Sequence, residues 1–140
     1  MKIMICGSMA FALRMKEVQA ELKKLGHTVF LPCDIDTHLS DSGLVEDLDA
    51  SHKACQTDDT IRKCYDLLAK SDGILVLNLN KNGVEGYIGI STLMEIGLAY
   101  CLGKKIFLFN QLPSYHEARW AHEVSIMKPV ILDGDFARIK

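Results

Sequence analysis

Short apolar runs alternate along the chain with stretches whose apolar residues recur at helical spacing. The runs predict β-strands over residues 2–6, 27–32, 72–79, 105–110 and 128–132. The helical stretches are 11–25, 60–70, 93–102 and 115–125. Buried strands separated by helices are typical of a parallel sheet covered on both faces. We therefore predict an α/β fold with a five-stranded parallel sheet in the order 2-1-3-4-5, connected by right-handed crossovers.

The helix predicted over 93–102 is apolar on every side except at Glu95. Thr92 and Glu95 fit a capping box, in which the threonine caps the helix and the glutamate bonds back to the amide of the cap. On the motif alone this interpretation is favoured, and it needs no substrate. A helix apolar all round is normally buried, however, and burial raises a carboxylate's pKa. Such a carboxylate beside a cleft can serve as a nucleophile, so both interpretations stay open.

A cleft is expected beyond the carboxyl ends of the first and third strands, where the strand order reverses. The loop after the first strand, "CGSMAF", contains Gly7 and Ser8, whose backbone amides can approach an anion or a sugar hydroxyl. The loop after the third strand, "NLNKNGVEGYIGIST", leads directly to Glu95 and contains glycines at every third position: Gly83, Gly86 and Gly89. These glycines indicate either a flexible loop or close backbone approach to a ligand. No dinucleotide fingerprint and no P-loop pattern is present.

The segment from Cys33 to Thr57 is polar and lacks a strong period. Loops of this length are usually lids or binding loops, or are disordered, and we expect a lid here. Its acidic residues are interpreted as a solvated face and its histidines, His38 and His52, as surface residues.

Length and composition favour one domain spanning residues 1–140, since 49% of the residues are hydrophobic. The net charge is −2, and the lysines and arginines are scattered, so we expect no nucleic-acid partner. The apolar run at the amino terminus is short and interrupted by Gly7, which argues against a membrane span.

The five cysteines form no C-x-x-C pair, and their odd number favours cytoplasmic thiols over a disulfide framework. The only spacing that resembles a metal site joins His52, Cys55 and Cys64. This set lacks the fourth ligand of a closed zinc site, so we predict no metal.

Three stretches together resemble the nucleoside 2-deoxyribosyltransferase superfamily, which includes 2'-deoxynucleoside 5'-phosphate N-hydrolases: "ICGSM", "KSDGILVL" and "STLMEIGLAYCLGKKIFLF". The resemblance covers most of residues 1–110. Its most specific part is E-x-G-x-A followed by G-K-K, here Glu95, Gly97, Ala99, Gly103, Lys104 and Lys105. The resemblance implies a flavodoxin-like (Rossmann-like) three-layer sandwich, a homodimer or higher homo-oligomer, and no cofactor.

The resemblance also implies that Glu95 attacks the anomeric carbon of a deoxyribosyl group, so that the base leaves and a glycosyl-enzyme forms. A second base or water then resolves the intermediate, as in retaining glycosidases. The predicted substrate-binding residues lie around the expected cleft: Gly7, Ser8, Met9, Asn78, Gly86, Gly89, Ser91 and Thr92.

The chain departs from the family at three positions. Cys64 stands where the family carries an aspartate, and we expect Asp66 or Asp59 to supply a supporting acid instead. Gly89 replaces a serine or aspartate six residues before the nucleophile, and Met9 replaces the arginine of the hydrolases.

The predicted function is cleavage or transfer of the N-glycosidic bond of (deoxy)nucleosides or their 5'-monophosphates. One alternative is a phosphoribohydrolase-like enzyme, which the S-T-x-x-E segment also resembles. The other alternative is a non-catalytic nucleotide-binding module, because fold does not dictate function.

Overall fold

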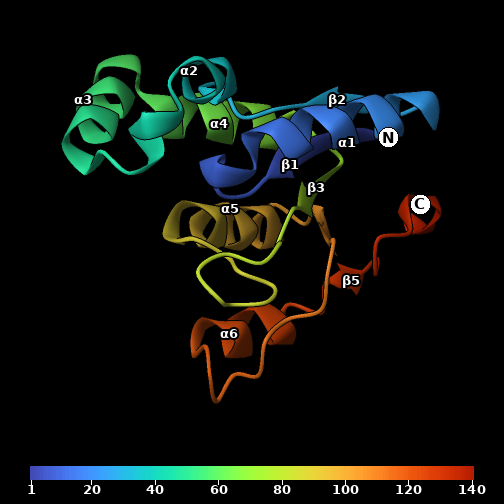
Figure 1. Cartoon of the computed structure of the whole chain (residues 1–140). Helices are drawn as coiled ribbons and strands as arrows, with labels where there is room; N and C mark the ends of the chain where they lie inside the picture. Colours follow the sequence, from blue (N-terminus) through green and yellow to red (C-terminus); the bar gives the residue numbers. More distant parts are fainter.

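The computed structural model describes residues 1–140, and five strands in it form one parallel sheet. The strands are β1 (Lys2–Cys6), β2 (Thr28–Phe30), β3 (Gly73–Val76), β4 (Lys105–Leu108) and β5 (Val130–Ile131). Their order is β2-β1-β3-β4-β5, which confirms the predicted order (Figure 1). The three longer strands are central, and the short β2 and β5 form the edges.

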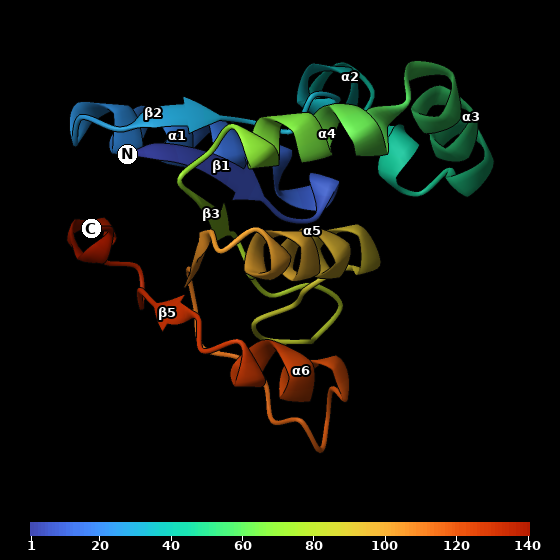
Figure 2. The ribbon, with the colours of Figure 1, turned by 180° about the vertical axis from the view of Figure 1, so that it is seen from behind.

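The side chains of each central strand alternate between two layers of helices. Ile3 and Ile5 pack in the core on the side of α1 (Ala12–Lys24), whereas Met4 and Cys6 face α4 (Thr60–Ala69) and α5 (Ile90–Cys101). The second layer also includes α6 (Trp120–Ile126), and the first also includes the short 3₁₀ helix η3 (Phe136–Arg138). Helix α1 lies in front of β1 in Figure 1 and behind it in Figure 2, where α4 comes forward. These layers make the fold flavodoxin-like.

The segment predicted as a long loop is largely helical. It contains α2 (Ile35–Ser40), the 3₁₀ helix η2 (Ser42–Val45) and α3 (Leu48–Asp58), and a further 3₁₀ helix, η1 (Met9–Phe11), precedes α1. The expectation of a long irregular loop was wrong, because side-chain caps at the starts of η2 and α3 define these elements without a strong hydrophobic period. The Asp47 carboxylate, for example, accepts a hydrogen bond from the Ala50 amide at 2.9 Å and starts α3.

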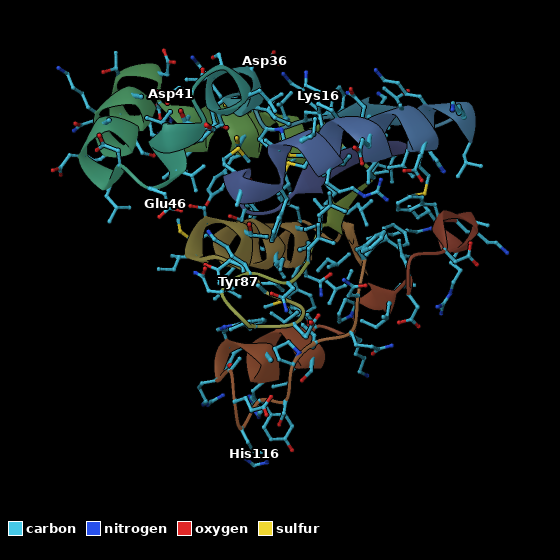
Figure 3. The ribbon with its side chains drawn as sticks, viewed as in Figure 1. Lys16, Asp36, Asp41, Glu46, Tyr87 and His116 are labelled. Atoms are coloured by element: carbon cyan, nitrogen blue, oxygen red, sulfur yellow. The ribbon has the colours of Figure 1, made fainter.

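An ion pair connects the first helix of this segment to α1. Lys16 Nζ lies 2.8 Å from Asp36 Oδ1, and both side chains are labelled in Figure 3. Helix α6 also differs from its prediction, since it begins at Trp120 and not at Tyr115. None of the helices combines the length and apolar character needed to cross a membrane.

Helix α5 begins three residues earlier than predicted, and its start decides between the two interpretations of Glu95. Gly89 is the N-cap residue, with extended backbone angles (φ −78°, ψ 169°), and no side chain caps the helix. The Leu93 amide donates to the Gly89 carbonyl at 2.9 Å, so Thr92 already lies inside the first turn. The capping-box interpretation was therefore wrong, and Glu95 is not needed to start the helix.

Candidate active site

A cavity of about 340 Å³ lies beyond the carboxyl ends of β1 and β3, where the topology predicted a cleft. This volume falls in the range of small-molecule sites. Helices α2, α3 and α4 contribute one side of it, and the first two turns of α5 contribute another. Figures 1 and 2 show the start of α5 on the same side of the molecule as α3. Most of the predicted site residues line the cavity: Gly7, Ser8, Met9, Gly89, Ser91, Thr92 and Glu95.

Glu95 occupies a position of α5 that normally carries an apolar side chain. Thr92, Glu95, Ile96 and Ala99 are the buried residues of the helix, and their spacing forms one core-facing stripe. The Glu95 residue is 8% exposed. Its burial raises the pKa of the carboxyl group to about 7, the Cys6 thiol partly opposes this effect, and the charge of Asp34 raises the pKa further. The carboxylate is therefore desolvated and only weakly hydrogen-bonded.

Mostly neutral groups surround Glu95. Cys6, at the end of β1, is fully buried, and burial and then the charge of Glu95 raise the pKa of its thiol. Burial likewise raises the pKa of the Cys64 thiol on α4. The pKa of Tyr65, which also lines the cavity, is raised by burial and by the charge of Glu95. No cationic side chain neutralises Glu95 through an ion pair within 4 Å.

Asp34 is the second carboxylate of the cavity. It follows β2, and its Oδ2 lies 3.5 Å from Nδ1 of His38, whose side chain is 6% exposed. The same imidazole nitrogen lies 3.1 Å from the Asp34 carbonyl oxygen, so His38 fixes this turn. The interpretation of His38 as a surface residue was therefore wrong, whereas His52 is exposed as expected.

The predicted supporting acids lie outside the cavity. Asp66 is exposed on α4. Asp59 adopts a left-handed conformation (φ 46°) between α3 and α4, and its Oδ2 accepts a hydrogen bond from Arg62 Nε at 3.0 Å. Asp34 lines the cavity instead of these two residues. The sequence contained a signal for Asp34, which comes just after the second strand. The carboxyl ends of all the parallel strands lie at the same edge of the sheet, where the cleft was expected.

Lys81 is a cavity residue that the sequence analysis missed. It lies in the loop after β3, for which the sequence predicted a role for the glycines but not for this lysine. Its Nζ donates a hydrogen bond to Ser8 Oγ at 3.0 Å and lies 5.2 Å from the centroid of the Tyr87 ring. Tyr87 is labelled in Figure 3, on the loop that runs alongside α5. Lys81 thus brings a cation next to the Gly7-Ser8 turn.

Asn78 and Gly86 do not line the cavity, which corrects their predicted role in substrate binding. Asn78 is completely buried, its Nδ2 donates to the carbonyls of Asn110 (2.9 Å) and Gln111 (3.2 Å), and its Oδ1 accepts from the Asn110 amide at 2.9 Å. Gly86 has φ 69°, and a Cβ atom there would collide with the Gln111 carbonyl. Both residues join the loops that follow β3 and β4.

The sequence matches no protein-family model, and a search of curated proteins finds no significant relative.

Proposed function

We propose that this protein cleaves or transfers the N-glycosidic bond of (deoxy)nucleosides or their 5'-monophosphates through a covalent glycosyl-enzyme on Glu95. The observation that carries the proposal is the placement of Glu95, a carboxylate inside the cavity that the helix does not use as a cap. Buried carboxylates that serve stability are normally paired or saturated with hydrogen bonds. Glu95 has neither form of compensation, which favours a role in chemistry over one in stability.

In the proposed reaction the ionised Glu95 attacks the anomeric carbon of the sugar. The bond between this carbon and the base nitrogen breaks, and the base leaves with the electron pair. The negative charge of Glu95 in a poorly solvated site stabilises the oxocarbenium-like transition state. Water or a second base then attacks the same carbon and releases Glu95.

We assign the role of acid to Asp34, which is the other carboxyl group lining the cavity. A base is a better leaving group when it receives a proton as the glycosidic bond breaks. The His38 imidazole beside Asp34 fixes the position from which that proton would be delivered. In the second half-reaction the same group would accept a proton from the attacking water.

Lys81 favours a substrate with an anionic 5' group. Its ammonium and the Ser8 hydroxyl lie together next to the Gly7 backbone, at the side of the cavity formed by the β1–α1 turn. An ammonium and backbone amides at a turn are typical partners of a phosphate. On this basis 5'-monophosphates are the preferred substrates within the proposed class.

The exposed side of α5 supports the proposal of a homodimer. Ile90 and Met94 are 83% and 47% exposed, and both line the cavity that contains Glu95. A symmetric partner would cover these side chains and close the cavity. Sedimentation at micromolar concentrations should give a dimer, and a strictly monomeric species would contradict it. The five free cysteines fit the proposed cytoplasmic location, where thiols stay reduced.

The proposal is tested with a panel of ribo- and 2'-deoxynucleosides and their 5'-monophosphates, with and without an acceptor base. Free base should appear without acceptor, because water can then resolve the glycosyl-enzyme. A new nucleoside should appear with acceptor if the protein transfers the sugar. Binding without base release would favour the nucleotide-binding module, and release of base from ribonucleotides alone would favour the phosphoribohydrolase-like enzyme.

A further inference from the structure

Two thiols and a carboxylate meet at one edge of the cavity. Cys33 and Asp34 follow β2, and Cys64 lies on α4. The Sγ atoms of the two cysteines are 3.5 Å apart, and these atoms and an Asp34 carboxylate oxygen all lie within 4.8 Å of one another. No other three side chains of histidine, cysteine, aspartate or glutamate form such a group. The segments are 31 residues apart in sequence, so the fold creates this cluster.

The two sulfur atoms have the spacing of ligands around one metal ion, and the Asp34 oxygen, within 4.8 Å of both, is close enough to join them. Zinc binds thiolates at about 2.3 Å and carboxylate oxygens at about 2.0–2.2 Å in a tetrahedron, so its ligand atoms lie roughly 3.5–4 Å from one another. Thiolates select soft and borderline cations such as Zn²⁺ over Mg²⁺ or Ca²⁺. We propose that Cys33, Asp34 and Cys64 bind one Zn²⁺ ion, with a fourth position free for water or another ligand.

The surroundings of the cluster are those of a metal site. The buried His38 lies 3.5 Å from the Asp34 carboxylate and can orient it, as groups outside the ligand sphere commonly do. Cys33 is exposed, which gives the ion a path from solvent, whereas Cys64 is buried. On binding, the two S–H bonds break, two Zn–S bonds form, and two protons pass to solvent. The site therefore needs reduced thiols.

The site bears on the proposed reaction because Asp34 and Cys64 line the same cavity as Glu95. A zinc ion on Asp34 would prevent this carboxyl group from acting as an acid. Zinc should then inhibit base release. This consequence rests on the proposed function, whereas the binding of zinc does not.

The experiment measures metal binding to the reduced full-length protein after treatment with a chelator. Zn²⁺ affinity is measured by competition with a chromophoric chelator, and Co²⁺ is used as a spectroscopic probe. We expect one ion per chain and a thiolate-to-cobalt charge-transfer band. Cys33→Ser and Asp34→Asn should each weaken Zn²⁺ binding about 10–100-fold. Cys101→Ser, at an exposed cysteine near the end of α5, is the matched control and should bind as the unmodified protein does.

Binding that is unchanged in Cys33→Ser, or the absence of a charge-transfer band, would overturn the metal site. The site would also be overturned if the reduced protein binds no zinc and the protein purified without reductant is two hydrogens lighter. The two thiols would then form a disulfide and not a metal site. Zinc binding without inhibition of base release would support the site and contradict the role of Asp34. Base release by a protein that binds no zinc would contradict the metal site and leave the proposed function standing.

Discussion

Asn78 and Glu95 are both almost completely buried near the carboxyl ends of the strands, but their environments differ. The Asn78 amide donates to two carbonyls and accepts from a backbone amide. The Cys6 thiol, a weak donor, only partly opposes the effect of burial on Glu95, whose pKa is raised to about 7. A saturated buried amide contributes to stability, whereas a poorly solvated carboxylate reduces it. The comparison indicates that Asn78 maintains the fold and that Glu95 is suited to chemistry.

The largest expected effect is on turnover, when Glu95 loses its charge. Glu95→Gln keeps the size of the side chain and an oxygen that can accept the Cys6 hydrogen bond, but an amide cannot attack the anomeric carbon. We expect base release to fall by at least about 10³-fold while the fold is retained. Chromatography of free base and circular dichroism measure the two effects. Glu117→Gln, at an exposed glutamate, is the control, and near-normal turnover of Glu95→Gln would contradict the nucleophile.

Substitution of Asn78 should reduce the stability of the protein. Asn78→Leu removes the hydrogen bonds to three backbone groups of residues 110 and 111. We expect the free energy of unfolding to fall by about 2–4 kcal/mol, because these groups would stay buried without partners. Denaturant unfolding measures this change. Asn80→Leu, at an exposed asparagine of the same loop, should change stability by less than about 0.5 kcal/mol, and equal effects of the two substitutions would contradict the structural role of Asn78.

The raised pKa of Glu95 predicts how stability depends on pH. The folded protein holds the Glu95 proton up to about pH 7, whereas the carboxyl group loses its proton near its ordinary pKa of 4.5 once the chain is unfolded. Below pH 4.5 the group does not affect the free energy of unfolding, because it is protonated in both states. As pH rises from 4.5 to 7 the group lowers this free energy progressively, and above pH 7 the reduction is constant. Each factor of ten in proton affinity corresponds to about 1.4 kcal/mol, so the reduction at pH 8 is about 3 kcal/mol.

Comparison with Glu95→Gln isolates this contribution from those of the other carboxylates. The variant should equal the unmodified protein in stability near pH 4 and exceed it by about 3 kcal/mol at pH 8. Denaturant unfolding at a series of pH values provides the measurement. A difference that does not change with pH would show that Glu95 is ionised normally in the folded protein.

A smaller effect is expected at Lys81, the cation at the other side of the cavity. Lys81→Met removes the ammonium and keeps much of the apolar stem. The kcat/KM for 5'-monophosphates should fall about 10–100-fold, as expected for one charged hydrogen bond, and that for nucleosides should not change. Lys23→Met, on α1, serves as the control. An equal loss for both kinds of substrate would contradict the preference for an anionic 5' group.

The sequence was sufficient to predict the fold and the position of Glu95 beside the cleft, because both depend on local patterns. The apolar runs defined the strands, their alternation with helices gave the sheet order, and the single charge of an apolar helix marked Glu95. Helices α2 and α3 were missed since neither has a clear hydrophobic period, and α3 is started instead by the Asp47 cap.

The rest of the site depends on contacts between distant segments. The partners of Asn78 lie 32 and 33 residues away, so nothing near Asn78 in the sequence distinguishes a saturated amide from a ligand-binding one. Lys81 meets Ser8 across 73 residues, and Cys33 meets Cys64 only because α4 packs beside the end of β2. Sequence patterns indicate which residues reach the strand ends, but packing determines which of them face the cavity.

The most direct test of the covalent mechanism is mass spectrometry after rapid quench of the reaction with a 2'-deoxynucleoside 5'-monophosphate. The peptide that contains Glu95 should carry the mass of the deoxyribosyl phosphate. The adduct should be absent in Glu95→Gln and should decay when water or an acceptor base is allowed to react. Base release without any adduct, and persisting in Glu95→Gln, would show direct attack by water and would contradict the glycosyl-enzyme on Glu95.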